Sequence, residues 1–70
     1  MTLIEKKKGL PGLRRVREAK GLTQAQLEAK IGASTGSVQR WEKAERDPSV
    51  WAAVAIADAL ETTVSDLIKE

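Results

Sequence analysis

The segment between Thr35 and Arg40 contains side chains that could form hydrogen bonds with the edges of nucleic acid bases. Arg40 can donate two hydrogen bonds to guanine O6 and N7, whereas Gln39 can pair with adenine or hold a phosphate. Thr35 adds a hydroxyl and a methyl group, and Gly36 would let a base or a phosphate approach the backbone closely. The residue types in this segment therefore suit base recognition.

A predicted helix would place these residues on one side. Val38 and Trp41 are three positions apart, so both would point into a core from the same side of that helix. Helical spacing then leaves the opposite side to Thr35, Gly36, Gln39 and Arg40. Because an α-helix fits the major groove of B-DNA, the pattern predicts a face that reads bases.

Residues that could contact phosphates lie on both sides of this segment. Gln24 would stand in the first turn of the preceding helix, where free backbone amides attract anions. Lys43 and Arg46 follow the segment and could hold the DNA backbone on its other side. Thr23 and Ser37 offer hydroxyl groups, and we assign them to phosphate contacts as well.

The elements that must position these side chains are short helices joined by tight connections. Thr23 and Gln26 match a capping box, and Gly32 would end the helix that they begin. Ser34 is expected to cap the next helix. Similar signals predict further helices that begin near Pro11, Ser49 and Thr63. Phe and Tyr are missing and no stretch alternates apolar with polar residues, so we predict an all-α fold of five helices.

The 70-residue chain is expected to form one domain with a short extension. We expect residues 1–10 to be a flexible basic N-terminal arm and residues 11–70 to form the helical domain. Residues 1–46 carry 11 Lys and Arg against 5 Glu, whereas residues 47–70 carry 1 Lys against 5 acidic residues. This asymmetry favours one surface for a polyanion and another turned away from it. The arm could follow a groove or the phosphates, or remain a solvated tail, through Lys6, Lys7 and Lys8.

The residues that the chain lacks exclude several function classes. Without Cys or His there is no disulfide, no thiol or imidazole catalyst and no zinc site. Paired carboxylates in an evident cleft and a glycine-rich phosphate loop are also missing, so we expect no enzyme, metal, cofactor or small-molecule ligand. The apolar runs are too short for a signal peptide or a membrane span. We therefore expect no membrane partner and a cytoplasmic location.

Several anchors between Leu13 and Ile68 fall at the spacing of a known family: Leu22–Leu27, Gly32, Ser37–Glu42, Pro48–Ser49 and Ala57–Leu60. The segment resembles the Cro and lambda-repressor-like helix-turn-helix family, also called Xre-type, whose members bind DNA. The resemblance implies that Gln24 binds phosphate and that Arg17 forms a structural ion pair with Glu42. It also implies base-facing positions at Ser34, Thr35, Gly36 and Arg40.

Four residues depart from the pattern of the family. Glu28 stands where Ala is usual, at the close approach of two helices, so either its carboxylate extends outward or the helix crossing opens. Ala44 replaces a usual Gly, which implies a longer preceding helix or a strained residue. Glu61 replaces a Gly that normally turns the chain. Gly36 is expected inside the base-reading helix, where it costs about 1 kcal/mol relative to Ala.

The segment Val50–Ala57 is apolar on nearly every side, and such a helix requires cover on every side. One side should join the core through Val50, Ala53, Ile56, Ala57 and Leu60. The remaining apolar residues predict an interface with a second copy of the chain, made by Trp51, Val54, Ala55 and Ile68. The alternative is that Leu3 and Ile4 of the arm fold back over Trp51.

Together these features predict a sequence-specific regulator of transcription that binds double-stranded DNA. We expect a bacterial or phage repressor that binds a pseudo-palindromic operator as a homodimer, with its third helix in the major groove. Activation through contact with RNA polymerase is an alternative. Two other roles stay open: an antitoxin-type regulator that also binds a toxin protein, and a protein-only adaptor without DNA binding, which Glu28, Gly36 and Ala44 would favour.

Overall fold

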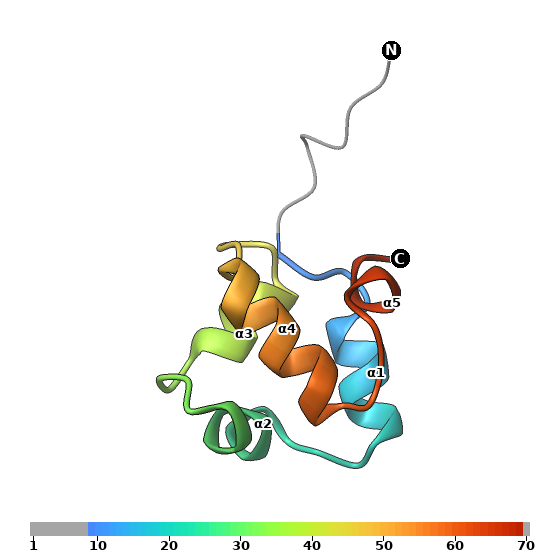
Figure 1. Cartoon of the computed structure of the whole chain (residues 1–70). Coiled ribbons are helices and arrows are strands. Elements are labelled where there is room, and N and C mark those ends of the chain that lie inside the picture. Colours follow the sequence, from blue (N-terminus) through green and yellow to red (C-terminus); the bar gives the residue numbers. More distant parts are fainter. Residues whose placement is uncertain (1–8, 70) are drawn as a thin grey trace.

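The computed structural model describes residues 9–69, and the described chain is helical without strands. Its helices are α1 (Leu13–Ala19), α2 (Gln24–Ile31), α3 (Ser37–Glu42), α4 (Val50–Ala59) and α5 (Val64–Ile68) (Figure 1). The predicted all-α, five-helix fold is confirmed. No helix in this part of the chain has the length and apolar character needed to cross a bilayer.

Side-chain caps start three of the five helices at the predicted residues. Thr23 Oγ1 accepts a hydrogen bond from the Gln26 amide at 3.0 Å, and Gln26 Oε1 accepts one from the Thr23 amide at 2.8 Å, which completes the capping box. Ser49 caps α4 and Thr63 caps α5 in the same manner, each through its hydroxyl. These bonds satisfy amides that a helix start leaves without partners.

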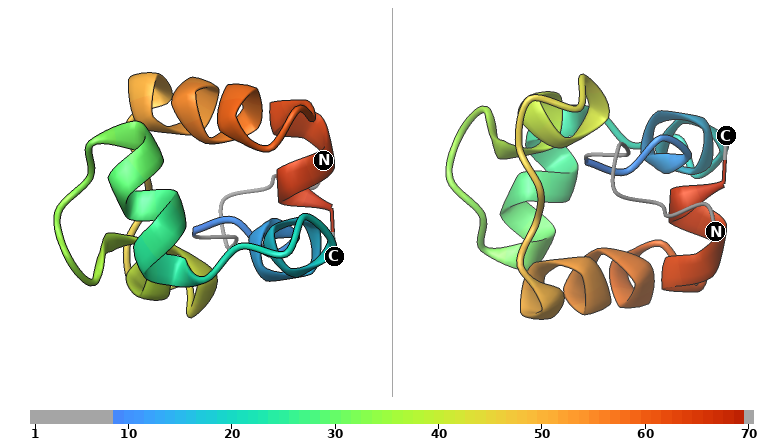
Figure 2. Two further views of the ribbon diagram at one scale, coloured as in Figure 1. Left: turned by 90° about the horizontal axis from the view of Figure 1, so that it is seen from below. Right: turned by 90° about the horizontal axis from the view of Figure 1, so that it is seen from above.

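The core receives a fully buried residue from every helix. Leu13, Leu27, Val38, Ile56 and Leu67 are all fully buried. Helix α2 packs against both α3 and α4, while α5 packs against α1 and α4. Seen from below, α4 lies on one side of the molecule and α1 on the other (Figure 2). The arrangement leaves α3 with one side on the core and the other free.

The N-terminal part of the described chain packs against the end of α3. Leu10 is buried, and its amide donates a hydrogen bond to the Trp41 carbonyl oxygen at 3.0 Å. The Gly9 amide donates to Asp47 Oδ1 at 2.7 Å, and a Cβ at position 9 would collide with the Trp41 carbonyl oxygen. Gly9 and Leu10, placed in the arm by the sequence, therefore belong to the folded part of the chain.

Two loop residues adopt backbone angles that favour glycine. Ala44 has φ 61° and Glu61 has φ 56°, in the left-handed region where a Cβ crowds the following carbonyl. Helix α3 ends at Glu42, so it is not extended through Ala44. Of the two predicted outcomes for Ala44, the structure therefore shows the strained residue. Both residues thus adopt the left-handed conformation of the glycine that is usual at these positions in the family.

One core prediction is wrong. Val50 was placed in the core, but it is 74% exposed in the first turn of α4. Ile56, Ala57 and Leu60 are buried as predicted, and Ala53 is half-buried. The buried side of α4 is therefore rotated away from Val50, which leaves more apolar surface outside than the sequence suggested.

Candidate nucleic-acid interface

Helix α3 has the two-sided character that its spacing predicts. Val38 is fully buried and Trp41 is nearly so. Gln39 and Arg40 are exposed on the opposite side, together with Thr35 in the preceding turn. Nothing in the described chain covers this side, so its hydrogen-bonding groups face outward.

The turn before α3 differs from the sequence prediction. Ser34 was expected to cap the helix, but the helix begins at Ser37, and Gly36 occupies the cap position with φ 91°. The Ser34 hydroxyl instead lies 3.0 Å from the Ser37 hydroxyl. Gly36 is therefore not inside the helix, and its positive φ suits glycine better than any other residue. Ser34 and Thr35 lie in the turn beside it.

The capping group of α3 comes from another helix. Glu28 of α2 is buried, and its Oε2 accepts hydrogen bonds from the amides of Gly36 at 2.9 Å and Val38 at 3.1 Å. The predicted alternative of an outward Glu28 carboxylate is wrong, because the carboxylate points inward and ties the two helices together. A carboxylate at a helix start is favoured by charge-assisted bonds and by the helix dipole.

A buried ion pair connects α1, α2 and α3. Arg17 Nε donates to Glu42 Oε2 at 2.6 Å, and Arg17 also donates to the Leu22 carbonyl oxygen at 2.7 Å. Both charged side chains are almost fully buried, and the predicted pair is confirmed. Gln24 Nε2 donates to Glu42 Oε1 at 2.9 Å, so one amide hydrogen of Gln24 is held within the protein. This network fixes the start of α2 relative to the end of α3.

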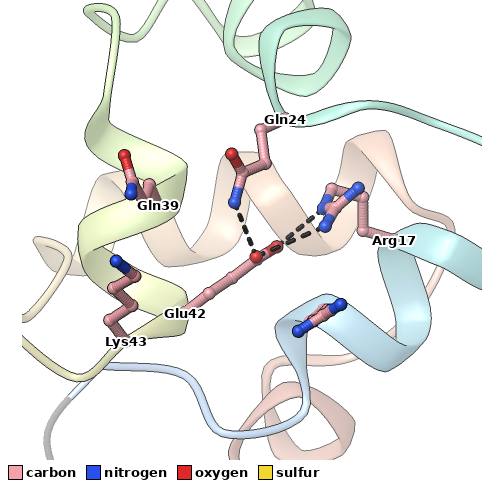
Figure 3. A pocket seen from close by; sticks show the side chains of 6 residues that line it. Arg17, Gln24, Gln39, Glu42 and Lys43 are labelled. Carbon is pink, nitrogen blue, oxygen red and sulfur yellow. Dashed lines mark hydrogen bonds and ion pairs between the residues drawn. The ribbon is translucent and has the colours of Figure 1, made fainter.

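A polar pocket of about 290 Å³ opens beside this network and is lined by Arg14, Arg17, Gln24, Gln39, Glu42 and Lys43. Gln39 and Lys43 reach it from α3 and Gln24 from α2 (Figure 3). Arg14 is exposed and pairs with Glu18 at 3.0 Å; this hydrogen bond, with the charge of Glu18, raises the pKa of Arg14 above its usual range. Since Arg17 is paired with Glu42 and Arg14 with Glu18, Lys43 is the lining cation for which the described residues 9–69 provide no ion-pair partner.

The sequence prediction did not include Arg14 among the phosphate contacts. The signal that could have found it is the spacing of α1, because Arg14 precedes the structural Arg17 by three positions and lies on a neighbouring part of the helix surface. Thr23, Lys43 and Arg46 are exposed, as their predicted role requires. Within residues 9–69, no ion pair involves Arg40, Lys43 or Arg46. The predicted arm contacts lie outside the described residues: Lys6, Lys7 and Lys8.

The exposed large apolar side chains of α4 and α5 are Val50, Trp51, Val54 and Ile68, which are here together called the α4–α5 patch. Trp51 is 83% exposed and Val54 and Ile68 are about half exposed, at 44% and 50%. Ala55, predicted to join them, is half-buried. Leu3 and Ile4, the alternative cover for Trp51, lie outside the described residues. The described chain thus has one polar, basic surface and one apolar surface.

Comparisons with known proteins agree with this geometry. Residues 13–67 match the helix-turn-helix protein family, and no curated protein sequence is significantly similar to the chain. The structure superimposes on the crystal structure of the restriction-modification controller protein C.AhdI from Aeromonas hydrophila, with a TM-score of 0.76 and 32% identity over 81% of this chain and 86% of that chain. The family consists of DNA-binding regulators without enzymatic activity. The chain belongs to the Xre-type, lambda-repressor-like helix-turn-helix family of DNA-binding domains.

Proposed function

We propose that this protein is a transcriptional repressor that binds a pseudo-palindromic operator as a homodimer. The observation that carries the proposal is the free outer side of α3, with Gln39 and Arg40 exposed while Val38 and Trp41 are buried. Each subunit would insert α3 into the major groove, and the two grooves would lie about one helical turn apart.

The turn before α3 and the exposed side of α3 would read the bases. Arg40 is the strongest candidate, because its guanidinium can donate two hydrogen bonds to one guanine. Gln39 would pair with adenine or help to hold a phosphate. The turn would place the remaining base contacts beside them, from Ser34, Thr35 and Gly36.

The pocket beside α3 would receive a phosphate of the DNA backbone. Lys43 supplies positive charge, Arg14 lines the pocket while paired with Glu18, and the second amide hydrogen of Gln24 remains to be donated. The residues that would hold the neighbouring phosphates are Thr23, Ser37, Arg46 and, from the arm, Lys6, Lys7 and Lys8. Such contacts fix the position of the protein on DNA without selecting a sequence.

The α4–α5 patch would join two copies of the chain around a two-fold axis. An exposed Trp with an exposed Val on either side of it in α4 is typical of the centre of an interface rather than of a solvated surface. A two-fold dimer repeats the recognition helix with opposite orientation, which is the symmetry of a palindromic site. The interface would therefore set the half-site spacing.

The comparisons support a regulatory role. The superimposed protein is named a controller of a restriction-modification system, which suits control of transcription by a chain of similar length. Less now favours the adaptor alternative, which was based on Glu28, Gly36 and Ala44. Glu28 caps α3, Gly36 occupies the turn before it and Ala44 the turn after it, and none of them covers the outer side of α3.

Selection of bound sequences from random DNA duplexes tests the proposal. We expect two inverted half-sites about one helical turn apart. Affinity for the selected duplex should fall steeply as salt rises, because phosphate contacts release counterions. A chain that bound all duplexes equally, or bound none in low salt, would contradict the proposal.

A further inference from the structure

We infer that Glu28 and Gly36 position the guanidinium of Arg40 and thereby help to determine sequence specificity, a role separate from the base contact proposed for the turn. The inference rests on the proposed function, in which Arg40 contacts a base. Its basis is a chain of contacts that begins at the buried carboxylate of α2, passes through the turn before α3 and ends at the Arg40 side chain.

The first contact holds the turn. α3 has no cap from a side chain of its own turn, because the Ser34 and Ser37 hydroxyls lie against each other. Glu28 Oε2 alone accepts the amide hydrogens of Gly36 and Val38, at 2.9 and 3.1 Å. Since Glu28 is 7% exposed, its carboxylate has little freedom to move, and the two bonds fix the backbone of the turn against α2.

The second contact places the arginine. A Cβ on Gly36 would lie 3.3 Å from Arg40 Nη1 and 3.7 Å from Arg40 Cζ. The guanidinium therefore folds back along α3 and rests against the backbone of position 36. A methyl group there would require the guanidinium to shift by a few tenths of an ångström, and a larger side chain would require a larger shift.

Two other glycines with positive φ show that this contact is not a general property of such turns. Gly21 has φ 74° and Gly32 has φ 72°, and a Cβ at either position would meet nothing within 4 Å. Positive φ explains why glycine suits all three positions, but only at Gly36 does the missing side chain also make room for a base-reading group. Arg40 is in no ion pair within residues 9–69, so its donors remain available.

The consequence is a preorganised recognition group. An arginine on a free helix surface loses side-chain entropy when it fixes its planar fork on a guanine. Resting against the turn before binding would reduce that loss and favour the base steps that the guanidinium reaches from this position. Glu28 and Gly36 are therefore positioning residues, and their effect should appear as discrimination between bases rather than as general affinity for DNA.

The test compares base preference at the operator position read by Arg40 in Gly36→Ala and Gly21→Ala. Both variants introduce a Cβ at positive φ, but only Gly36→Ala places that Cβ against the guanidinium. We expect the preference to fall about tenfold in Gly36→Ala, the size of a weakened bidentate contact, and to stay unchanged in Gly21→Ala. Arg40→Ala should remove the preference, and adding Gly36→Ala to it should cause no further loss.

Variants at Glu28 provide a second, independent test. Glu28→Ala removes the acceptor for both amides and should reduce the same preference, whereas Glu28→Gln keeps an oxygen in place and should restore most of it. Amide hydrogen exchange without DNA should show faster exchange of Gly36 and Val38 in Glu28→Ala than in Glu28→Gln. This measurement detects the loosened turn directly.

The outcomes separate the inference from the proposed function. A wild-type chain that selects no sequence would remove the proposed function and the inference together. Wild-type selection that depends on Arg40 but is unchanged in Gly36→Ala or Glu28→Ala would overturn the inference alone. The inference would also be overturned if Gly36→Ala reduced the base preference equally in the wild-type chain and in Arg40→Ala. The methyl group would then act directly on DNA rather than through Arg40.

Discussion

The α2–α3 hairpin and the α4–α5 patch are exposed surfaces of opposite character in one small chain. The hairpin exposes hydrogen-bonding and cationic groups, and buried charges hold its backbone from beneath, with Glu28 on two amides and Glu42 on Arg17. The α4–α5 patch exposes Val, Trp and Ile. Its helices are held by apolar burial, by the hydroxyl caps at Ser49 and Thr63, and by an exposed contact between Arg15 and Asp66.

The difference indicates how each surface would bind its partner. A surface that reads DNA must hold donors in fixed positions, and buried carboxylates with several hydrogen bonds provide that rigidity. A surface that joins two copies gains its energy from removing apolar area from water, for which fixed donors are unnecessary. The two surfaces should therefore respond to different substitutions.

The largest expected effect comes from breaking the ion pair beneath the hairpin. Glu42→Ala leaves the buried Arg17 without its partner and frees the Gln24 amide, so it should destabilise the fold by about 3–5 kcal/mol. Chemical denaturation measures the loss. As the control, Arg14→Ala breaks the exposed pair with Glu18 without removing a partner of Arg17 and should change stability by less than about 1 kcal/mol. Equal losses in the two variants would show that burial of the pair is unimportant.

The next effect concerns the α4–α5 patch. Trp51→Ala should weaken self-association by about 2 kcal/mol or more, because a Trp at the centre of an interface contributes strongly to binding. Sedimentation equilibrium of the variant and the wild type measures this change. DNA binding should weaken through loss of the dimer, while the preferred half-site stays the same. A Trp51→Ala variant that remains dimeric would show that two copies meet elsewhere.

Arg40→Ala should show the opposite pattern. Specific binding should weaken by about 1–3 kcal/mol, with relaxed preference at one base position and unchanged self-association. Lys43→Ala, on the same helix end but directed at phosphate, should weaken binding to all sequences alike and reduce the salt dependence. A preferred sequence that survives Arg40→Ala unaltered would show that the recognition surface is assigned to the wrong side of α3.

The smallest effect lies in the loop that joins the two regions. Ala44 has φ 61°, so Ala44→Gly should stabilise the fold by about 1 kcal/mol through relief of left-handed strain. Ala29→Gly, at an exposed position inside α2, should instead destabilise it by a similar amount, about 1 kcal/mol. Thermal unfolding of both variants shows whether the change in stability has opposite signs, as predicted. A loss of stability in Ala44→Gly would mean that the Ala44 backbone is not strained.

Much of the fold could be predicted because its signals are local. Thr23, Ser49 and Thr63 each start a helix at the position that their hydroxyl groups indicate, and Val38 and Trp41 are buried where helical spacing places them. Family resemblance predicted the one long-range contact that the sequence analysis named, between Arg17 and Glu42. Local patterns thus supplied the elements and the side of α3 that faces the core.

The features that the sequence analysis missed depend on distant partners. Ser34 is a good capping residue, but Glu28 of α2 reaches the α3 amides instead, and no pattern around position 34 indicates that competitor. Val50 has the hydropathy of a core residue, but the direction in which α4 packs against α2 and α5 leaves it outside. Such outcomes are decided by packing between elements, which helical spacing alone does not describe.

Backbone amide shifts in the NMR spectrum of the labelled chain, recorded as the selected duplex is added, test the central claim most directly. We predict the largest changes at Thr23, Gln24 and residues 34–43, with little change at Trp51, Val54 and Ile68. Changes concentrated on the α4–α5 patch, with the amides of residues 34–43 unaffected, would contradict the assignment of the outer side of α3 to DNA.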